Sequence, residues 1–331
     1  MEKYSQIDAA GFTRLSGENV NPLEVLSRQL GDKFDKYRDD WDRVNSFELE
    51  TEFPISIDFE TVSSCNLECV MCSLGYKKNN RRKMADFNLF KKIIDEAAGR
   101  LKSVLLNVLG EPLLHKQFMK FVDYAYNNGV VDIMLNTNGI LLNKKITNQL
   151  LDSGLTRLHI SIDASDSDTY LKIRGQDKYD LIRNNIEHFR LERDRRDKRL
   201  PLIRASFVKC KENIDQIEKF KREFRELVDF FSIQEFYNPM PDSDEALVHA
   251  PEIKKEFHDQ CNQPWNRLVI LSNGDVGPCC ATGSIAQLKI GDANTQTIEE
   301  IWNSPKMKQL RSIHKRREYY KDPLCKVCLE Q

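Results

Sequence analysis

The stretch CNLECVMC, from Cys65 to Cys72, places three cysteines close together after an apolar strand pattern. Three residues separate Cys65 from Cys69, and two separate Cys69 from Cys72. Disulfides belong mainly to exported proteins, and the N-terminal sequence MEKYSQIDAAG lacks the apolar core of a signal peptide. A structural zinc site takes four ligands, normally as two close pairs. Both kinds of site are weaker explanations of the triplet, and a chance spacing is a third alternative, so its meaning depends on the sequence around it.

The composition is that of an ordinary globular protein. The chain has 331 residues, of which 31% are charged and 40% hydrophobic. Its net charge of −1 lacks the basic excess of a nucleic-acid-binding protein. No apolar run approaches the length of a transmembrane helix. We therefore expect a cytoplasmic protein with no nucleic-acid or membrane partner, in which nine cysteines serve metal or redox chemistry.

Strand and helix patterns alternate from Phe53 onward, which predicts a parallel sheet with connecting helices. The predicted strands cover residues 54–60, 103–109, 131–137, 157–163, 202–209 and 230–236. The predicted helices cover residues 86–100, 116–128, 143–153, 179–193 and 212–227. Residues 1–52 are expected to form a mostly helical N-terminal extension, with helical spacing over 23–30 and 34–44 and irregular structure around Ser16 to Pro22.

Several predicted strands carry polar residues at every second position. The clearest sets are Ser56, Asp58 and Glu60 in the first strand and His159, Ser161 and Asp163 in the fourth. Because side chains alternate across a strand, one face of the sheet is polar and the other apolar. Strands of a fully packed parallel sheet are usually apolar on both faces. The pattern favours a polar cavity inside the sheet, although edge positions facing solvent would give the same alternation.

The spacing of Cys65, Cys69 and Cys72 resembles the signature of the radical S-adenosylmethionine enzymes. The resemblance implies an α/β fold, an open partial (β/α)6 TIM-like barrel over residues 53–240. It also implies that the three cysteines bind a [4Fe–4S] cluster, whose fourth iron is chelated by the amino and carboxylate groups of S-adenosylmethionine. In that family the reduced cluster cleaves this cofactor, and the resulting 5′-deoxyadenosyl radical abstracts hydrogen from a substrate. A flavodoxin- or ferredoxin-type reductant is implied as a partner.

The same resemblance assigns contacts to S-adenosylmethionine. LGEPLLH, residues 109–115, is similar to the family's Gly-Gly-Glu-Pro motif, with Leu109 in place of the first glycine, and implies that Gly110 and Glu111 receive the methionine amino group. Met71 stands where the family often has an aromatic residue against adenine. The ribose and carboxylate contacts are implied at Asn136, Ser161, Asp163 and Arg174. A plain strand-to-helix turn and a surface arginine remain the alternatives.

A second group of cysteines lies near the C-terminus and resembles the SPASM/twitch auxiliary-cluster domain. We expect this small domain over residues 261–331, built from a hairpin and a helix and joined by a linker over 241–260. Asn273-Gly274-Asp275 predicts the hairpin turn, and residues 297–311 predict the helix. The resemblance implies a second [4Fe–4S] cluster on four cysteines, with zinc as the alternative. The implied ligands are Cys261, Cys279, Cys325 and Cys328, and the choice between Cys279 and Cys280 stays open.

The C-terminal spacing resembles the single-cluster domain of aminocyclitol dehydrogenases. It implies an oxidoreductase that oxidises a hydroxyl carbon of a sugar, an aminocyclitol or a nucleotide-linked sugar to a ketone, with the auxiliary cluster accepting an electron. Glu235, at the end of the sixth strand, is the candidate base. The alternatives are an epimerase, in which Cys210 or Cys280 returns a hydrogen atom, an enzyme that modifies a ribosomal peptide, and a non-catalytic electron carrier.

Overall fold

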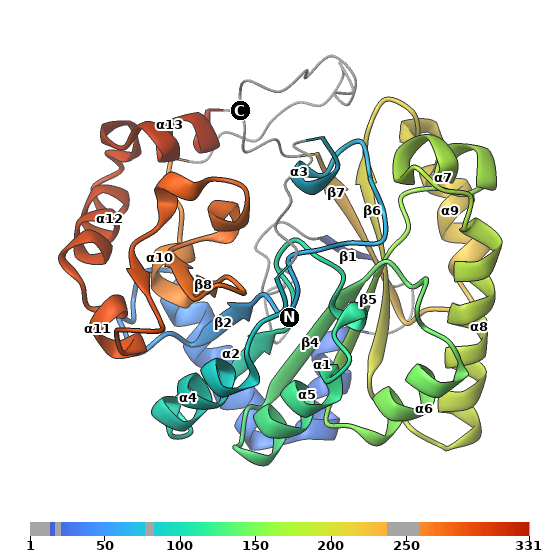
Figure 1. Cartoon of the computed structure of the whole chain (residues 1–331), viewed down its shortest axis with the longest axis horizontal. Helices are drawn as coiled ribbons and strands as arrows, with labels where there is room; N and C mark the ends of the chain where they lie inside the picture. Colours follow the sequence, from blue (N-terminus) through green and yellow to red (C-terminus); the bar gives the residue numbers. More distant parts are fainter. Residues whose placement is uncertain (1–13, 17–20, 77–82, 237–258, 331) are drawn as a thin grey trace.

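The computed structural model describes residues 14–16, 21–76, 83–236 and 259–330, and their strands form one sheet (Figure 1). The order is β1-β7-β6-β5-β4-β3-β2-β8-β9-β10. Neighbours from β7 through β8 are parallel, whereas β1, β9 and β10 pair antiparallel. The strands are β1 (Arg14–Ser16), β2 (Ser56–Phe59), β3 (Ser103–Leu105), β4 (Asp132–Thr137), β5 (Arg157–Ser161), β6 (Leu202–Lys209), β7 (Phe230–Glu235), β8 (Arg267–Ile270), β9 (Asp275–Gly277) and β10 (Gly291–Asp292).

All six predicted strands are present as β2 to β7, so the predicted partial barrel is confirmed. Strand β3 ends at Leu105, earlier than predicted, because the chain then leaves the sheet for the LGEP loop. The first strand of the predicted hairpin, β8, also joins the parallel sheet, which was not predicted. It pairs with β2 from Ser56↔Arg267 to Phe59↔Ile270, so the C-terminal region extends the barrel sheet. The domain boundaries stay predictions, and most of the expected linker lies outside the described residues.

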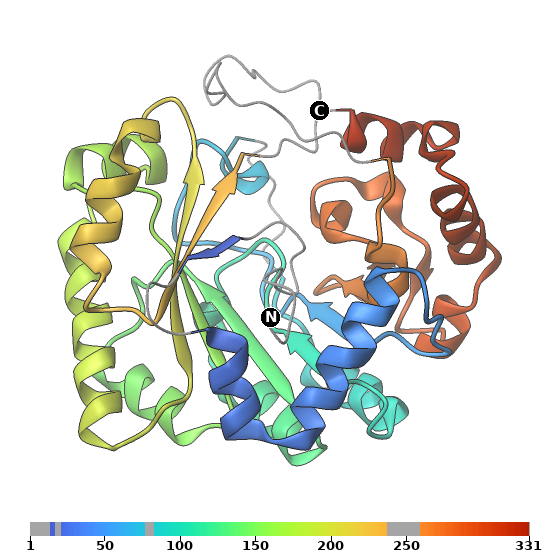
Figure 2. The same cartoon turned by 180° about the vertical axis from the view of Figure 1, so that it is seen from behind.

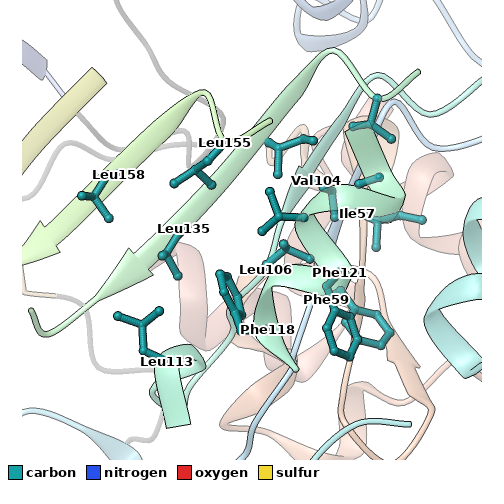
Figure 3. Close-up of a cluster of buried hydrophobic side chains, with 14 of the residues drawn as sticks. Ile57, Phe59, Val104, Leu106, Leu113, Phe118, Phe121, Leu135, Leu155 and Leu158 are labelled. Atoms are coloured by element: carbon teal, nitrogen blue, oxygen red, sulfur yellow. The ribbon is translucent and has the colours of Figure 1, made fainter. Parts of the chain in front are cut away.

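Helices that follow the strands cover the outer face of the sheet (Figures 1 and 2). Their apolar sides pack on the outward strand residues, as Phe118 and Phe121 do against Phe59 and Leu106 in Figure 3. Among the described residues no helix has the length and hydropathy to cross a bilayer. The elements are α3 (Ser73–Tyr76), α4 (Phe87–Ala97), η1 (Pro112–Leu114), α5 (Phe118–Asn127), α6 (Lys144–Asp152), α7 (Ser167–Arg174), α8 (Tyr179–Arg195), η2 (Ile214–Gln216) and α9 (Ile217–Phe224).

Four of the predicted helices appear as α4, α5, α6 and α8, and the fifth is divided between η2 and α9. Helix α7 was not predicted. Its capping residues define this helix, which has no long apolar stripe. The Asp166 side chain accepts from Thr169 N at 3.0 Å at its start, and Gly175, with φ +79°, ends it. A short helix of this kind depends on its caps and on tertiary packing, which explains why periodicity missed it.

The N-terminal extension forms α1 (Pro22–Leu30) and α2 (Asp32–Asn45), as predicted. Asn21 caps α1, and Gly31, with φ +69°, separates the two helices. They lie across the face of the sheet opposite the outer helices (Figure 2). Their buried residues form a second hydrophobic core together with residues of the sheet and of α10. The helices contribute Leu23, Leu26, Phe34, Tyr37, Trp41 and Val44, and the rest of the chain contributes Ile55, Met134, Leu202, Phe230 and Trp265. Strand β1 occupies part of the region expected to be irregular and pairs with β7.

The C-terminal region contains the predicted hairpin between β8 and β9, closed by Leu271 N donating to Asp275 O at 2.8 Å. The single helix predicted over 297–311 is wrong. Two helices form, because Pro305 has no N–H to continue the first, and Ser304 caps the second by accepting from Met307 N at 3.3 Å. The elements here are α10 (Gln263–Asn266), η4 (Cys280–Gly283), η5 (Ala286–Leu288), α11 (Ile298–Trp302), α12 (Pro305–Lys315), η6 (Tyr319–Lys321) and α13 (Pro323–Leu329).

Candidate functional site

The loop after β2 holds Cys65, Cys69 and Cys72 at the carboxyl edge of the parallel sheet. Cys72 N donates to Cys69 O at 3.0 Å, which forms a tight turn around the last two cysteines. Burial raises the pKa of Cys65 to about 11, and the charges of Glu111, Cys69 and Cys72 raise it further. The three thiols are therefore close enough to repel one another as thiolates. Crowded thiolates of this kind are stable only around a cation, so the donor set fits an iron–sulfur cluster.

Two polar side chains point at the cysteine sulfurs. Asn138 Nδ2 lies 3.8 Å from Cys65 Sγ and donates to Asn66 Oδ1 at 2.7 Å. Arg174 Nη1 lies 3.5 Å from Cys69 Sγ. Donors to ligating sulfurs stabilise thiolates, so both contacts support a cluster bound by this loop. Asn138 was not singled out from the sequence, although it belongs to the NTNG segment; Asn136 was selected instead.

Gly110 is required by a close approach of two backbones. A Cβ atom at this position would lie 2.0 Å from Val62 O and 2.7 Å from Ser64 O. Glu111 N donates to Ser64 O at 2.9 Å and so fastens the LGEP loop to the segment that leads into Cys65. The motif therefore does more than turn the chain between a strand and a helix, because it sets the distance between Glu111 and the cysteine loop.

The Glu111 carboxylate is buried and accepts three hydrogen bonds. Thr137 Oγ1 and Leu113 N donate to Oε1 at 2.8 and 3.0 Å, and Asn138 N donates to Oε2 at 2.8 Å. Burial raises the pKa of Glu111, and these bonds oppose the rise. A carboxylate offers about four acceptor positions. One position is left on a rigid carboxylate beside the cysteines, which fits the role predicted for Glu111 as acceptor of the methionine amino group.

Asp163 and Arg174 form a buried ion pair through Arg174 Nη2 and Asp163 Oδ2. Asp163 also accepts from Val208 N at 2.7 Å and has φ +62°, which an aspartate tolerates better than most residues. The sequence predicted that both residues contact S-adenosylmethionine, whereas here they contact each other, and Arg174 also contacts Cys69. Their contact with the cofactor stays a prediction.

The other predicted cofactor contacts lie at different depths. Met71 packs beside Cys210 and Ile173 behind the cysteine loop. Asn136 Oδ1 lies 2.8 Å from His159 Nδ1. His159 precedes Ser161 by two residues on β5, and Ser161 is half-buried at the end of that strand. The structure thus places Asn136 with the polar inner face of the sheet, while its neighbour Asn138 reaches the cysteines.

That inner face is polar, as the alternation of residues predicted. Asp58 on β2 and Arg267 on β8 pair at 3.0 Å, and Arg267 also stacks on Trp41 of α2. His159 is buried, and its Nε2 has no hydrogen-bond partner within the described part of the chain. Burial, and then the charges of Arg204 and Arg157, hold the pKa of His159 well below its usual range. The inner face therefore presents neutral and paired polar groups above the helical layer of α1 and α2.

Two of the predicted catalytic residues do not face this region. Glu235 is the last residue of β7; its side chain is 48% exposed and forms an ion pair with Lys209. A base must reach the substrate, and the role of Glu235 as that base stays a prediction. Cys210 is fully buried against Ile173, Met71 and Phe236, and burial raises its pKa to about 12. It is a core thiol rather than part of the polar inner face.

The second cysteine group converges from three segments. Cys261 precedes α10, Cys279 follows β9, and Cys325 and Cys328 lie three residues apart on one face of α13. Burial raises the pKa of Cys261 to about 12, and Cys328 and Cys280 add to the rise. Burial, followed by Cys280 and Cys261, also raises the pKa of Cys279. These four half-buried thiols repel one another and are the candidate ligands of an auxiliary cluster. Within the described part of the chain, no three or more such side chains are already set at metal-binding positions, so their role as ligands stays a prediction.

The adjacent thiols of Cys279 and Cys280 have different surroundings. Gln263 binds both the thiol and the main chain of Cys280. Gln263 Nε2 donates to Cys280 Sγ at 3.2 Å, and Gln263 Oε1 accepts from Cys280 N at 2.7 Å. Cys280 is exposed, and its charged neighbours are Arg267 and Asp58 of the inner face. Cys279 interacts with Cys261 and Cys328, and Cys280 also interacts with Cys261. The two hydrogen bonds to Gln263 distinguish Cys280 from Cys279 and favour Cys279 as the ligand, and this choice stays a prediction.

His314 was not singled out from the sequence. It lies 3.4 Å from Cys325 Sγ through Nε2 and accepts from Cys261 N through Nδ1 at 3.3 Å. No local pattern distinguishes such a histidine, because the two cysteines that it contacts are far from each other in the chain.

Comparison with known proteins gives two family matches. A model described as the radical SAM superfamily matches residues 59–194, and a model described as an iron-sulfur cluster-binding domain, SPASM, matches residues 261–329. A curated relative from Pyrococcus furiosus, the tungsten-containing aldehyde ferredoxin oxidoreductase cofactor-modifying protein, is 23% identical over 309 residues. The match covers 81% of this chain and 85% of the relative.

Solved structures share the fold at low identity. BtrN in complex with AdoMet and 2-DOIA superposes with a TM-score of 0.58 at 19% identity, covering 85% of this chain and 94% of BtrN. Streptococcus suis SuiB bound to S-adenosylmethionine superposes with a TM-score of 0.65 at 17% identity, covering 89% of this chain and 76% of SuiB. At these identities the likeness supports the architecture described above, a partial barrel followed by a cysteine-rich C-terminal region.

Proposed function

This chain belongs to the radical S-adenosylmethionine superfamily and carries a SPASM domain, and on that premise we propose that it oxidises a hydroxyl-bearing carbon of a small polar molecule to a ketone. Its cofactors are S-adenosylmethionine, the radical [4Fe–4S] cluster and an auxiliary cluster. When bound, they supply a 5′-deoxyadenosyl radical that removes a hydrogen atom from carbon. A net oxidation then needs an acceptor for one electron and an acceptor for one proton.

The observation that carries the proposal is the contact between the two cysteine regions. Strand β8, which leads to the auxiliary cysteines, pairs with β2, which leads to Cys65. Ser73, next to Cys72, lies 3.2 Å from Ser284 through the two hydroxyl oxygens. A Cβ on Gly283 would lie 2.8 Å from the side chain of Leu109 in the LGEP loop. The auxiliary site is therefore built against the radical site, where it can receive an electron from a substrate held between them.

The polar inner face supports a small hydroxylated substrate such as a sugar, an aminocyclitol or a nucleotide-linked sugar. The Asp58–Arg267 pair and the His159–Asn136 pair face inward and supply both hydrogen-bond donors and acceptors. The helices α1 and α2 close the inner face from below with an apolar layer. The fold also spans 94% of BtrN, whose structure was solved with 2-DOIA bound.

His159 is a further candidate proton acceptor, besides Glu235. Asn136 Oδ1 can only accept, so His159 Nδ1 carries the ring proton, and Nε2 keeps its lone pair. Its low pKa keeps the ring neutral, which leaves Nε2 available as a base. Removal of a hydroxyl proton becomes easier once the attached carbon is a radical, so a weak base on the inner face suffices for this step.

The experiment is a reaction of the reconstituted enzyme with S-adenosylmethionine and dithionite, which stands in for the proposed flavodoxin- or ferredoxin-type reductant. A panel of cyclitols, aminocyclitols, sugars and nucleotide-linked sugars is followed by mass spectrometry. The expected product is lighter by two hydrogen atoms and forms in proportion to 5′-deoxyadenosine. The Cys65/Cys69/Cys72→Ala variant is the control without a radical cluster. A product that has the mass of the substrate in ordinary water and carries deuterium at carbon after reaction in heavy water contradicts the oxidation.

That contrary result would support a second candidate function, epimerisation, which the placement of Cys280 favours. Its thiol is exposed, lies near the inner-face pair Asp58–Arg267 and is oriented by Gln263. Under this reading, Cys280→Ala abolishes deuterium uptake, whereas Cys210→Ala retains it.

A further inference from the structure

His314 connects two of the three segments that supply the auxiliary cysteines, those of Cys261 and Cys325. It lies in the last turn of α12 and is 1% exposed. Nδ1 accepts from the main-chain N–H of Cys261 at 3.3 Å, and Nε2 lies 3.4 Å from Cys325 Sγ. The main-chain oxygen of His314 accepts from Gln260 Nε2 at 3.2 Å, which holds the Cys261 segment against the end of α12.

These contacts determine the position of the ring proton. A main-chain N–H can only donate, so Nδ1 of His314 holds the lone pair and Nε2 carries the proton in the neutral ring. Because Nδ1 accepts this hydrogen bond, the imidazole is neutral, and its Nε2–H donates to the sulfur of Cys325.

We propose that His314 is a positioning residue that donates a hydrogen bond to the Cys325 thiolate and thereby raises the reduction potential of the auxiliary cluster. Reduction adds negative charge to the cluster sulfurs, so a donor at a ligating sulfur stabilises the reduced state more than the oxidised state. Removing the donor should therefore make the cluster harder to reduce.

The consequence for the reaction rests on the proposed function. The substrate radical loses its hydroxyl proton to a base and one electron to the oxidised auxiliary cluster, so that its C–O bond becomes a C=O bond. A higher potential at that cluster makes this electron transfer more favourable. His314 would then bias the radical toward oxidation and away from recapture of a hydrogen atom.

The test is a redox titration of the auxiliary cluster followed by electron paramagnetic resonance. The background is the Cys65/Cys69/Cys72→Ala variant of the full chain, reconstituted with iron and sulfide, so that only the auxiliary cluster contributes. His314→Phe should shift the midpoint potential to more negative values. His314→Gln, which can still donate through its amide, should shift it less. The control His188→Phe, on the outer helix α8, should leave the potential unchanged.

An unchanged midpoint potential in His314→Phe, with iron content retained, would overturn the proposal. If that variant fails to hold iron, the native ring provides a second readout. With ¹⁵N-labelled histidine, the reduced cluster should show a weak nitrogen coupling that disappears in His314→Gln. No coupling in the parent protein would also overturn the proposal. Neither measurement uses a substrate, so a wrong assignment of the oxidation would be detected separately.

Discussion

Arg174 places its guanidinium group between the Asp163 carboxylate and the cysteine loop. Nη2 pairs with Asp163 Oδ2, Nη1 lies 3.5 Å from Cys69 Sγ, and Nε lies 3.4 Å from the main-chain oxygen of Ile162. Both side chains are nearly fully buried. Burial raises the pKa of Asp163, and Arg174 opposes that rise. Asp163 thus holds the cation that faces a predicted cluster ligand.

Arg174→Gln should lower the free energy of unfolding of the apo protein by about 3–5 kcal/mol, because it leaves the Asp163 carboxylate buried without its cation. Urea denaturation followed by circular dichroism measures the change. The double variant Arg174→Gln/Asp163→Asn should recover more than half of the loss, since asparagine also tolerates the positive φ of position 163. A double variant no more stable than Arg174→Gln would argue against the ion pair as the cause.

Gly110→Ala should prevent assembly of the radical cluster. The new methyl group would lie 2.0 Å from Val62 O, so the LGEP loop must move away from the segment before Cys65. Overpacking of this kind costs about 1–3 kcal/mol, and the displacement also moves Glu111. Iron analysis and the yield of 5′-deoxyadenosine measure the effect.

Gly129→Ala is the comparison for that prediction. A Cβ at Gly129 meets nothing within 4 Å, so this substitution strains only a backbone with φ +81° at a distant helix end. It should retain iron and cofactor cleavage. Equal losses in the two variants would mean that the close approach at Gly110 is unimportant.

Substitution of the adjacent cysteines should separate their roles. Cys279→Ala should lose the auxiliary cluster and about half of the iron, because Cys279 lies among the other auxiliary cysteines. Cys280→Ala should keep both clusters, because that thiol is held by Gln263. Iron content and the ultraviolet–visible spectrum of each reconstituted variant give the answer. If Cys280→Ala loses the auxiliary cluster and Cys279→Ala keeps it, then Cys280 is the ligand and Cys279 is not.

His159 should make the stability of the protein depend on pH. Its pKa is lowered in the folded state, so below about pH 6.5 the unfolded chain binds one more proton than the folded chain at this residue. The contribution of His159 therefore lowers the free energy of unfolding as the pH falls through that value. His159→Gln should flatten the slope between about pH 5 and pH 6.5.

Urea denaturation at several pH values measures that slope. Ser206→Ala, which changes a neighbouring inner-face position without a titratable group, should leave the slope as it is in the parent protein. If the slope in His159→Gln equals the slope in the parent protein, the imidazole titrates in the folded state as it does in the unfolded chain.

The sequence alone determined the type and order of most elements. Alternating strand and helix patterns predict the parallel barrel because each pattern records which face of one local element is buried. The spacing of Cys65, Cys69 and Cys72 is equally local, and so is the Asn273-Gly274-Asp275 turn. These features need no knowledge of distant residues, and the structure contains the predicted barrel strands and the hairpin.

Tertiary structure alone decided which distant residues meet. The pairing of β8 with β2, the contact of Arg174 with Cys69 and the bridge from His314 to Cys325 each join residues that no local pattern relates. The direction of Glu235 depends on strand register, because a shift by one residue exchanges the two faces of a strand. The cysteine stretch therefore identifies the chemistry, while the register and packing of the sheet select the side chains that surround it.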